Sequence, residues 1–333
     1  MSRKLKPQPK LSVAKKKPPS WQREKSISRL ILIFISLISV LIIGLVGYWG
    51  YDSYVAAWRQ PVVKVNETTV DMNHFVKMLR FYSRNPDITI DAISYPYQVL
   101  YIIEDNELIR QGARDLNIQV PPDEVTEEIS GFLMPPTEDE GNATQPEVDL
   151  DKLYNQWLDT IQLSDEEYRQ LVETDLLEKR TTEYLREHNV PTEAEQVHLN
   201  IILLGNETAA AEVSEKLMAG GNFTELAVEY SLVEELRESG GDAGWVPRGI
   251  YPELDDVAFA LEIGNVTEPI LIGQGYYIVR VSEKADSMDI PEEFQVTLAD
   301  GEFQKWLQEQ REAGIIEEFL DQDKINWAIE QLI

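Results

Sequence analysis

The chain carries SGGDAGWVPRG at residues 239–249, DVAFAL at 256–261, GNVTEPI at 264–270 and GYYIV at 275–279. A Gly-rich turn, a short apolar helix and an apolar strand follow one another here, because glycine permits tight turns and tyrosine, isoleucine and valine favour strands. Upstream, Val197–Leu204 predicts a further strand and Ala209–Ala219 a helix. This alternation of a small sheet with covering helices predicts an α+β domain over residues 193–285.

In order and in spacing, these blocks resemble the run G-G-D-L-G-W, A-A-F-x-L, G-E-v-S-x-P and G-Y-H-I-I of the parvulin family, the rotamases of PpiC type. The resemblance implies the parvulin fold, a small antiparallel sheet covered by helices, and peptidyl-prolyl cis-trans isomerase activity. It also implies that the structural positions of the family are kept at Gly240, Gly241, Asp242, Gly244 and Trp245. Among these, Asp242 is expected to stabilise the turn with its carboxylate.

Both signature histidines of the parvulins are replaced in this chain. The resemblance aligns Ile201 with the first histidine and Tyr277 with the second. His198 precedes Ile201 by three residues, an odd offset that places the two side chains on opposite faces of a strand. We therefore expect isomerase activity at the level of the family to be absent.

The other catalytic positions of the family also differ here. The resemblance places Val233 at the cysteine-or-aspartate position, Leu254 at the proline-pocket phenylalanine and Ile272 at the threonine before the last strand. The residues expected to bind peptide are Tyr251, Leu254, Phe259 and Tyr277. The resemblance implies no cofactor, and the acidic residues show no metal-ligand spacing.

Residues 56–192 are predicted to be mostly helical. Apolar residues recur at helical spacing over Asp71–Tyr82 and Tyr95–Leu116, and Ser164 opens a further helix with a capping box. This block resembles the N-terminal chaperone region of the SurA, PrsA and trigger-factor group. The resemblance implies a chaperone domain directly before the parvulin domain.

Residues 286–333 are predicted to be a linker followed by C-terminal helices. The linker is expected to reach residue 301, and Phe303–Phe319 is expected to be one helix that carries apolar residues such as Trp306 and Ile316. In SurA-like proteins the C-terminal helix returns to the N-terminal region. The resemblance therefore implies that these helices pack on the chaperone domain.

Residues 30–50 are predicted to form a transmembrane helix. Leu30 to Trp49 contains no charged residue, and a helix of this length spans about 30 Å, the hydrocarbon thickness of a bilayer. All ten lysines and arginines of the first fifty residues precede this run. Residues 1–29 are therefore expected to be a disordered basic tail in the cytoplasm, with the bulk of the chain extracytoplasmic. The alternative, a cleaved signal peptide, requires a shorter apolar run and a small-residue cleavage site.

The part expected outside the membrane is strongly acidic. The whole chain has a formal net charge of −29, and residues 51–333 hold 20 basic against 58 acidic residues. Such a surface stays soluble and repels nucleic acid. The chain has no cysteine, which excludes disulfides, thiolate metal sites and thiol catalysis.

Together these features predict a folding factor in the cell membrane, a single-pass foldase or chaperone similar to SurA, PrsA and PpiD that binds unfolded or proline-containing polypeptides. An apolar groove binds by burial, so a parvulin domain can lose catalysis and still bind peptide. Two alternatives remain open: an active isomerase that uses Tyr277 in place of histidine, and a non-catalytic scaffold that binds one specific envelope partner. Neither the client proteins nor the oligomeric state follows from the sequence.

Overall fold

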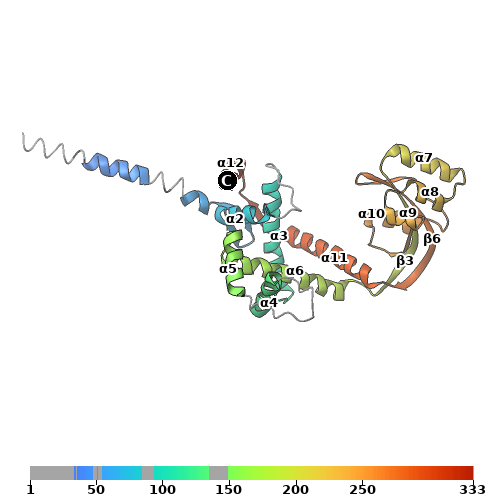
Figure 1. Ribbon diagram of the computed structural model, residues 1–333, viewed down its shortest axis with the longest axis horizontal. Helices are drawn as coiled ribbons and strands as arrows, with labels where there is room; N and C mark the ends of the chain where they lie inside the picture. The colour runs from blue at the N-terminus through green and yellow to red at the C-terminus, as the bar shows by residue number, and fades with distance from the viewer. Residues whose placement is uncertain are drawn as a thin grey trace, which may run out of the picture. The chain divides into compact units, whose positions relative to one another are not determined.

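The computed structural model describes residues 34, 36–47, 51, 55–84, 94–134 and 149–332 of the chain. The predicted basic tail, residues 1–29, lies outside the described residues. The described residues form two compact units: one holds those before Val62 together with 71–73, and the other holds 62–70 and those from His74 onward. Figure 1 labels the helices and strands in chain order.

The first unit contains part of the predicted transmembrane run. Residues 36–47 are helical and expose their side chains, and η2 (Ala57–Arg59) is a single 3-10 turn. Within the described residues, the structure has no helix that is both long and apolar enough to cross a membrane. The remaining residues of the predicted span, 30–33, 35 and 48–50, lie outside the described ones.

A helical region precedes the parvulin-like region, and within it α6 packs on α3 and α4. The long helix α6 begins with the predicted capping box: the Ser164 hydroxyl accepts the Glu167 N–H, and the Glu167 carboxylate accepts the Ser164 N–H. The capping box is therefore confirmed. The elements of this region are β1 (Pro61–Val65), β2 (Thr68–Asp71), α2 (Met72–Tyr82), α3 (Tyr95–Asp115), α4 (Pro122–Leu133), α5 (Leu150–Ile161) and α6 (Asp165–Asn189).

The C-terminal residues form α11 (Glu292–Ala313), β7 (Ile316–Glu318) and α12 (Gln322–Glu330). Helix α11 packs on α6 and α3, and β7 pairs antiparallel with β1 in a sheet of order β2-β1-β7. The expected helix over Phe303–Phe319 is therefore wrong beyond Ala313. After Gly314 the backbone pairs with the β1–β2 hairpin instead, because the Asn66 N–H donates to the Ile315 carbonyl at 2.8 Å. The expected linker up to residue 301 is also wrong, since a strand and α11 occupy most of it.

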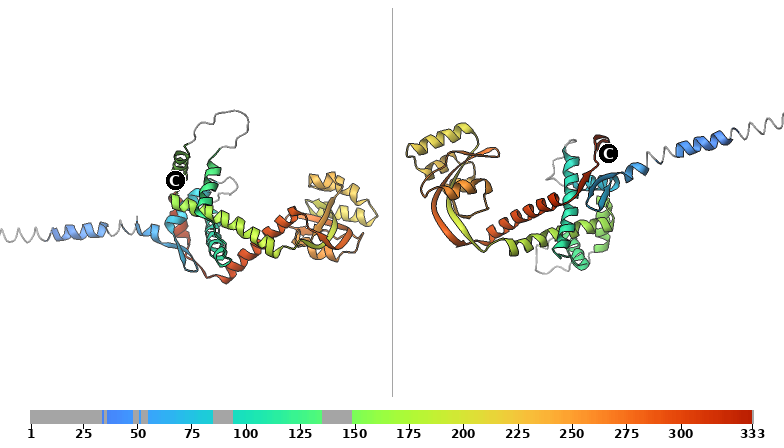
Figure 2. Two further views of the ribbon diagram at one scale, coloured as in Figure 1. Left: turned by 90° about the horizontal axis from the view of Figure 1, so that it is seen from below. Right: turned by 180° about the vertical axis from the view of Figure 1, so that it is seen from behind.

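The parvulin-like region is an antiparallel sheet of order β4-β3-β6-β5. The two long strands, β3 and β6, pair from Glu193↔Asp289 to Leu204↔Tyr276 and lie side by side in both views of Figure 2. A small antiparallel sheet covered by helices is the predicted architecture, and it is confirmed. Its elements are β3 (Glu193–Leu204), α7 (Glu207–Met218), α8 (Phe223–Tyr230), α9 (Glu234–Glu238), β4 (Asp242–Pro247), α10 (Pro252–Ala260), β5 (Ile270–Ile272) and β6 (Gly275–Asp289).

Strand β3 is buried on both faces and separates two apolar cores. Leu199 and Ile201 pack on one side with residues of α10, and Ile202 and Leu204 pack on the other side with residues of α7 and α8. This split follows from strand geometry, because successive side chains point to opposite faces of a sheet. The face that holds Ile201 is the one on which a parvulin-like site is expected.

Candidate functional site

The Gly-rich block holds β3 and β4 together beside the candidate site. Gly241 has a φ of +87°, and its carbonyl accepts the Ile201 N–H at 2.7 Å. A Cβ at this position would lie 2.9 Å from the Cβ of Ala227 in α8 and 3.0 Å from the Ile201 carbonyl oxygen. Only glycine combines this backbone conformation with this close approach. The Asp242 carboxylate accepts the Gly244 N–H at 2.9 Å and thereby braces the turn.

Four of the five replaced family positions come together on one face of the sheet. Ile201 is 3% exposed and Leu254 is 2% exposed, and both belong to a single apolar core. Tyr277 and Ile272 are half-buried and pack against that core. Ile201 lies opposite Val279, and Tyr277 opposite Leu203, in the β3–β6 register, so the two histidine positions are diagonal neighbours.

The fifth family position and one predicted peptide-binding residue lie outside this core. Val233 is half-buried and is the residue before α9, and Tyr251 is 39% exposed and is the residue before α10. Phe259, which is also predicted to bind peptide, belongs to the core and is 8% exposed. The Arg248 guanidinium lies 4.0 Å from the centre of the Phe259 ring and forms an ion pair with Glu195. A charged side chain therefore covers one side of the apolar core.

His198 lies on the opposite face and takes part in a separate polar group. Its Nδ1 is 2.9 Å from the Ser282 hydroxyl oxygen, and its Nε2 is 3.6 Å from Asp242 Oδ1. The ring also contacts Trp245 edge-on at 5.4 Å between centroids. The histidine that this chain does carry in β3 is therefore engaged away from the Ile201 face and does not replace the missing one.

Sequence reasoning missed most of this polar group. Asn200, two residues after His198, accepts from the Arg280 guanidinium, which lies 4.7 Å from the centre of the Phe223 ring. Ser282 and Arg280 are on β6, about eighty positions after their β3 partners, so no local spacing indicates these contacts. The one sequence signal for this polar group is that His198 and Asn200, two positions apart on β3, place polar side chains on the same face of the strand.

The chemistry available on the Ile201 face follows from these residues. Of the five replaced family positions, only Tyr277 has a polar group, its phenol hydroxyl. Leu254 and Phe259 are 2% and 8% exposed and belong to the domain's own core, so the half-buried Ile272 and Tyr277 present the accessible surface among these residues. The two histidines that support rotation in the parvulins are replaced by an aliphatic side chain and a phenol.

Comparison with known proteins gives two family matches. Residues 20–182 match the SurA-like N-terminal domain, and residues 205–283 match the PPIC-type PPIASE domain. The second match begins after Ile201, so the first histidine position lies just before it.

Individual relatives match along much of the chain. The "Foldase protein PrsA" of Halalkalibacterium halodurans is 30% identical over 245 residues, which are 70% of this chain and 68% of the relative. The "Periplasmic chaperone PpiD" of Haemophilus ducreyi is 36% identical over 97 residues, which are 29% of this chain and 16% of the relative. Among solved structures, a peptidylprolyl isomerase (PrsA) from Bacillus anthracis is 23% identical and covers 70% of this chain and 94% of its own, with a TM-score of 0.40. This chain, a SurA-like N-terminal domain followed by a PpiC-type rotamase domain, belongs to the family of PrsA- and PpiD-like parvulin foldases.

Proposed function

We propose that this chain is an extracytoplasmic, membrane-anchored folding factor that binds unfolded polypeptides and does not depend on histidine-assisted prolyl isomerisation. One observation carries the proposal. Both histidine positions of a retained parvulin scaffold hold other residues, Ile201 within an apolar core and Tyr277 packed against it. The residues that build the scaffold, such as Gly241 and Asp242, keep their turn geometry.

The physical argument separates binding from catalysis. Rotation about a peptide bond has a barrier of about 20 kcal/mol, and isomerisation requires a site that stabilises the twisted amide. Binding an unfolded segment requires apolar surface and few polar contacts. Ile272 and Tyr277 are half-buried and pack against the core, and their accessible apolar surface supports binding of proline-containing or apolar segments at this face.

Membrane anchoring is the second part of the proposal. The uncharged run from Leu30 to Trp49 and the ten basic residues before it favour a single crossing with the N-terminus in the cytoplasm. The described residues 36–47 are helical, which is compatible with such a crossing. An anchored folding factor meets its clients as they emerge from the membrane.

The experiment is aggregation of a chemically unfolded, cysteine-free client protein diluted into buffer with the full chain in detergent micelles. The proposal expects aggregation to fall in proportion to the chain added, up to an equimolar amount. Micelles alone, and micelles with an unrelated single-pass protein of similar net charge, are the controls. Aggregation equal to that in the controls contradicts the proposal.

A working isomerase is the second candidate, and one observation favours it. The Tyr277 hydroxyl occupies the position of the second histidine on a half-buried side chain, where it can donate to a substrate carbonyl. In that case the chain accelerates isomerisation of an Xaa-Pro peptide, and Tyr277→Phe, which removes only the hydroxyl, abolishes the acceleration. Equal rates for the wild type and this variant exclude the hydroxyl as the catalytic group.

A further inference from the structure

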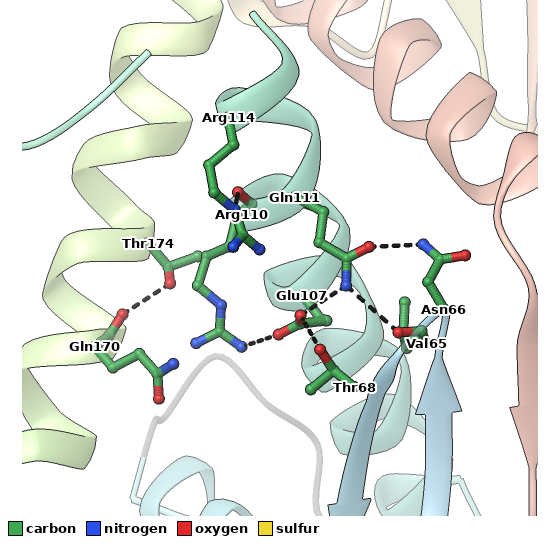
Figure 3. A network of polar contacts seen from close by, with 9 residues as sticks. All are labelled: Val65, Asn66, Thr68, Glu107, Arg110, Gln111, Arg114, Gln170 and Thr174. Carbon is green, nitrogen blue, oxygen red and sulfur yellow. Dashed lines mark hydrogen bonds and ion pairs between the residues drawn. The ribbon is translucent and has the colours of Figure 1, made fainter. Parts of the chain in front are cut away.

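A polar cavity of 550 Å³ lies within the helical region. Helices α3 and α6, the segment 118–120 after α3 and Thr68 of β2 line it, and Figure 3 shows the polar contacts around it. On each helix the lining residues are three or four positions apart, the spacing that gathers side chains on one helix face. The polar residues that line it are Glu107, Arg110 and Arg114 from α3, Gln119 from the segment after α3, Gln170 and Glu173 from α6, and Thr68 from β2.

Contacts inside the protein satisfy the charge of Glu107. This side chain is 4% exposed, accepts from the Thr68 hydroxyl and from Gln111 Nε2, each at 2.7 Å, and pairs with Arg110. Burial raises the pKa of Glu107, but the hydrogen bonds from Gln111 and Thr68 and the Arg110 charge outweigh it and hold the pKa below its ordinary value. Glu107 and Arg110 therefore neutralise each other. Asn66 donates to Gln111 Oε1 at 2.6 Å and extends the same network to the hairpin.

Arg114 is a cation that this network does not neutralise. It is exposed, and its Nε donates to the Arg110 carbonyl at 3.0 Å, while its terminal nitrogens form no ion pair with any residue that the structure describes. The side chain of Gln170 is also exposed, and it makes no hydrogen bond with any described residue.

We propose that this cavity binds a carboxylate of a polypeptide client, with Arg114 and Gln170 as the donors. A guanidinium presents parallel N–H groups that fit a carboxylate in a bidentate pair, and the carboxamide of Gln170 adds a further donor. The inference rests on the proposed binding of unfolded polypeptides, and the carboxylate comes from an acidic side chain or from a free C-terminus.

Glu173 distinguishes this proposal from recognition of an uncharged peptide backbone. It lines the same cavity and forms no ion pair with a described residue, so its charge opposes an incoming anion. A carboxylate site therefore gains affinity when Glu173 becomes glutamine. A site that accepts backbone N–H groups on Glu173 loses affinity from the same substitution.

The test is fluorescence anisotropy with the full chain in detergent micelles and peptides that carry a neutral dye. Two acetylated and amidated peptides differ only in a central Glu or Gln, and a third is the Gln peptide with a free C-terminus. We expect at least one carboxylate-bearing peptide to bind about fivefold or more tightly than the amidated Gln peptide. Tighter binding of the Glu peptide identifies an acidic side chain as the source of the carboxylate, and tighter binding of the Gln peptide with the free terminus identifies a C-terminus. Arg114→Gln removes the difference, and Glu173→Gln enlarges it.

Arg237→Gln is the matched control, because Arg237 is an exposed arginine on α9 and does not line the cavity. It keeps the preference of the wild type. Equal binding of all three peptides, or a preference that survives Arg114→Gln in a variant with unchanged circular dichroism, overturns the carboxylate site and leaves the proposed function standing. Absence of binding by any of the peptides overturns the proposed function together with the inference.

Discussion

At the residue scale, Gly241 joins three elements at one point. Its carbonyl accepts the Ile201 N–H in β3, its own N–H donates to the Leu236 carbonyl in α9, and its Cα lies close to Ala227 in α8. The backbone of Ile201, at the first histidine position, is therefore held by a turn that tolerates no side chain. The scaffold beneath the candidate site depends on this glycine.

Gly241→Ala is expected to lower the free energy of unfolding by about 2 kcal/mol or more, because a left-handed backbone and a forced contact with Ala227 add together. Gly244→Ala is the matched control: its φ is +74°, but no atom lies within 4 Å of the added Cβ, so it should cost about 1 kcal/mol. Urea denaturation followed by tryptophan fluorescence measures both. Equal losses for the two variants would show that the contact with Ala227 does not matter.

Residue identities at the candidate site could be predicted from spacing, but their contacts could not. The run from Ile201 to Tyr277 carries fixed blocks, so family positions transfer one by one. The pairing of His198 with Ser282 and Asp242 depends on strand register and on a β-bulge next to His198, and no sequence signal specifies that bulge.

At the element scale, one arginine ties α11 to α3. The Arg311 guanidinium binds Glu104 and Asp105 and lies 3.9 Å from the centre of the Tyr101 ring. Glu104 is 2% exposed, and burial raises its pKa above the ordinary value of 4.5, although the hydrogen bond and charge of Arg311 lower it. The packing of α11 on α3 therefore relies on a buried ion pair, whose disruption is costly.

Arg311→Leu is expected to destabilise the chain by about 3 kcal/mol at pH 7, because it leaves Glu104 charged and unpaired in the interior. Without Arg311 the folded-state pKa of Glu104 rises further, so the folded state binds more protons than the unfolded state above pH 4.5. Stability of the variant then falls as pH rises through this window, and its deficit relative to the wild type is larger at pH 7 than at pH 4.5. Urea midpoints at the two pH values check this; a deficit independent of pH would contradict the role of Glu104.

The elements differ in how far the sequence specifies them. In helices α3 and α6, apolar residues recur at helical spacing over several turns, and α6 also begins with a capping box. Local sequence signals therefore suffice to predict both helices. Strand β7 is three residues long and pairs with β1, about 250 positions earlier in the chain. A segment this short shows no alternation, and its strand conformation exists only because a distant partner satisfies its backbone.

At the scale of the whole molecule, the chain combines a proposed anchor, a SurA-like helical region and a parvulin region without the two histidines. The fold of both regions could be predicted, because each carries sequence blocks of its family. Residues 51–333 hold 58 acidic against 20 basic residues, which favours a soluble surface that resists association with its clients.

Membrane topology is testable because the chain has no cysteine. Ser20→Cys and Ser287→Cys each introduce a single thiol, one on either side of the proposed crossing. In intact cells a membrane-impermeant maleimide should label Ser287→Cys and not Ser20→Cys, and both should react after permeabilisation. Labelling of both thiols, or of neither, in intact cells would be incompatible with the proposed orientation.

The central claim is that the parvulin scaffold is intact and its isomerase chemistry is lost. The most direct measurement is the isomerisation rate of a Glu-Pro and a Leu-Pro peptide with the full chain in micelles, beside Ile201→His/Tyr277→His. We predict that the wild type leaves the uncatalysed rate unchanged and that the double variant, folded by circular dichroism, accelerates it. Acceleration by the wild type would contradict the account and identify the chain as a working isomerase.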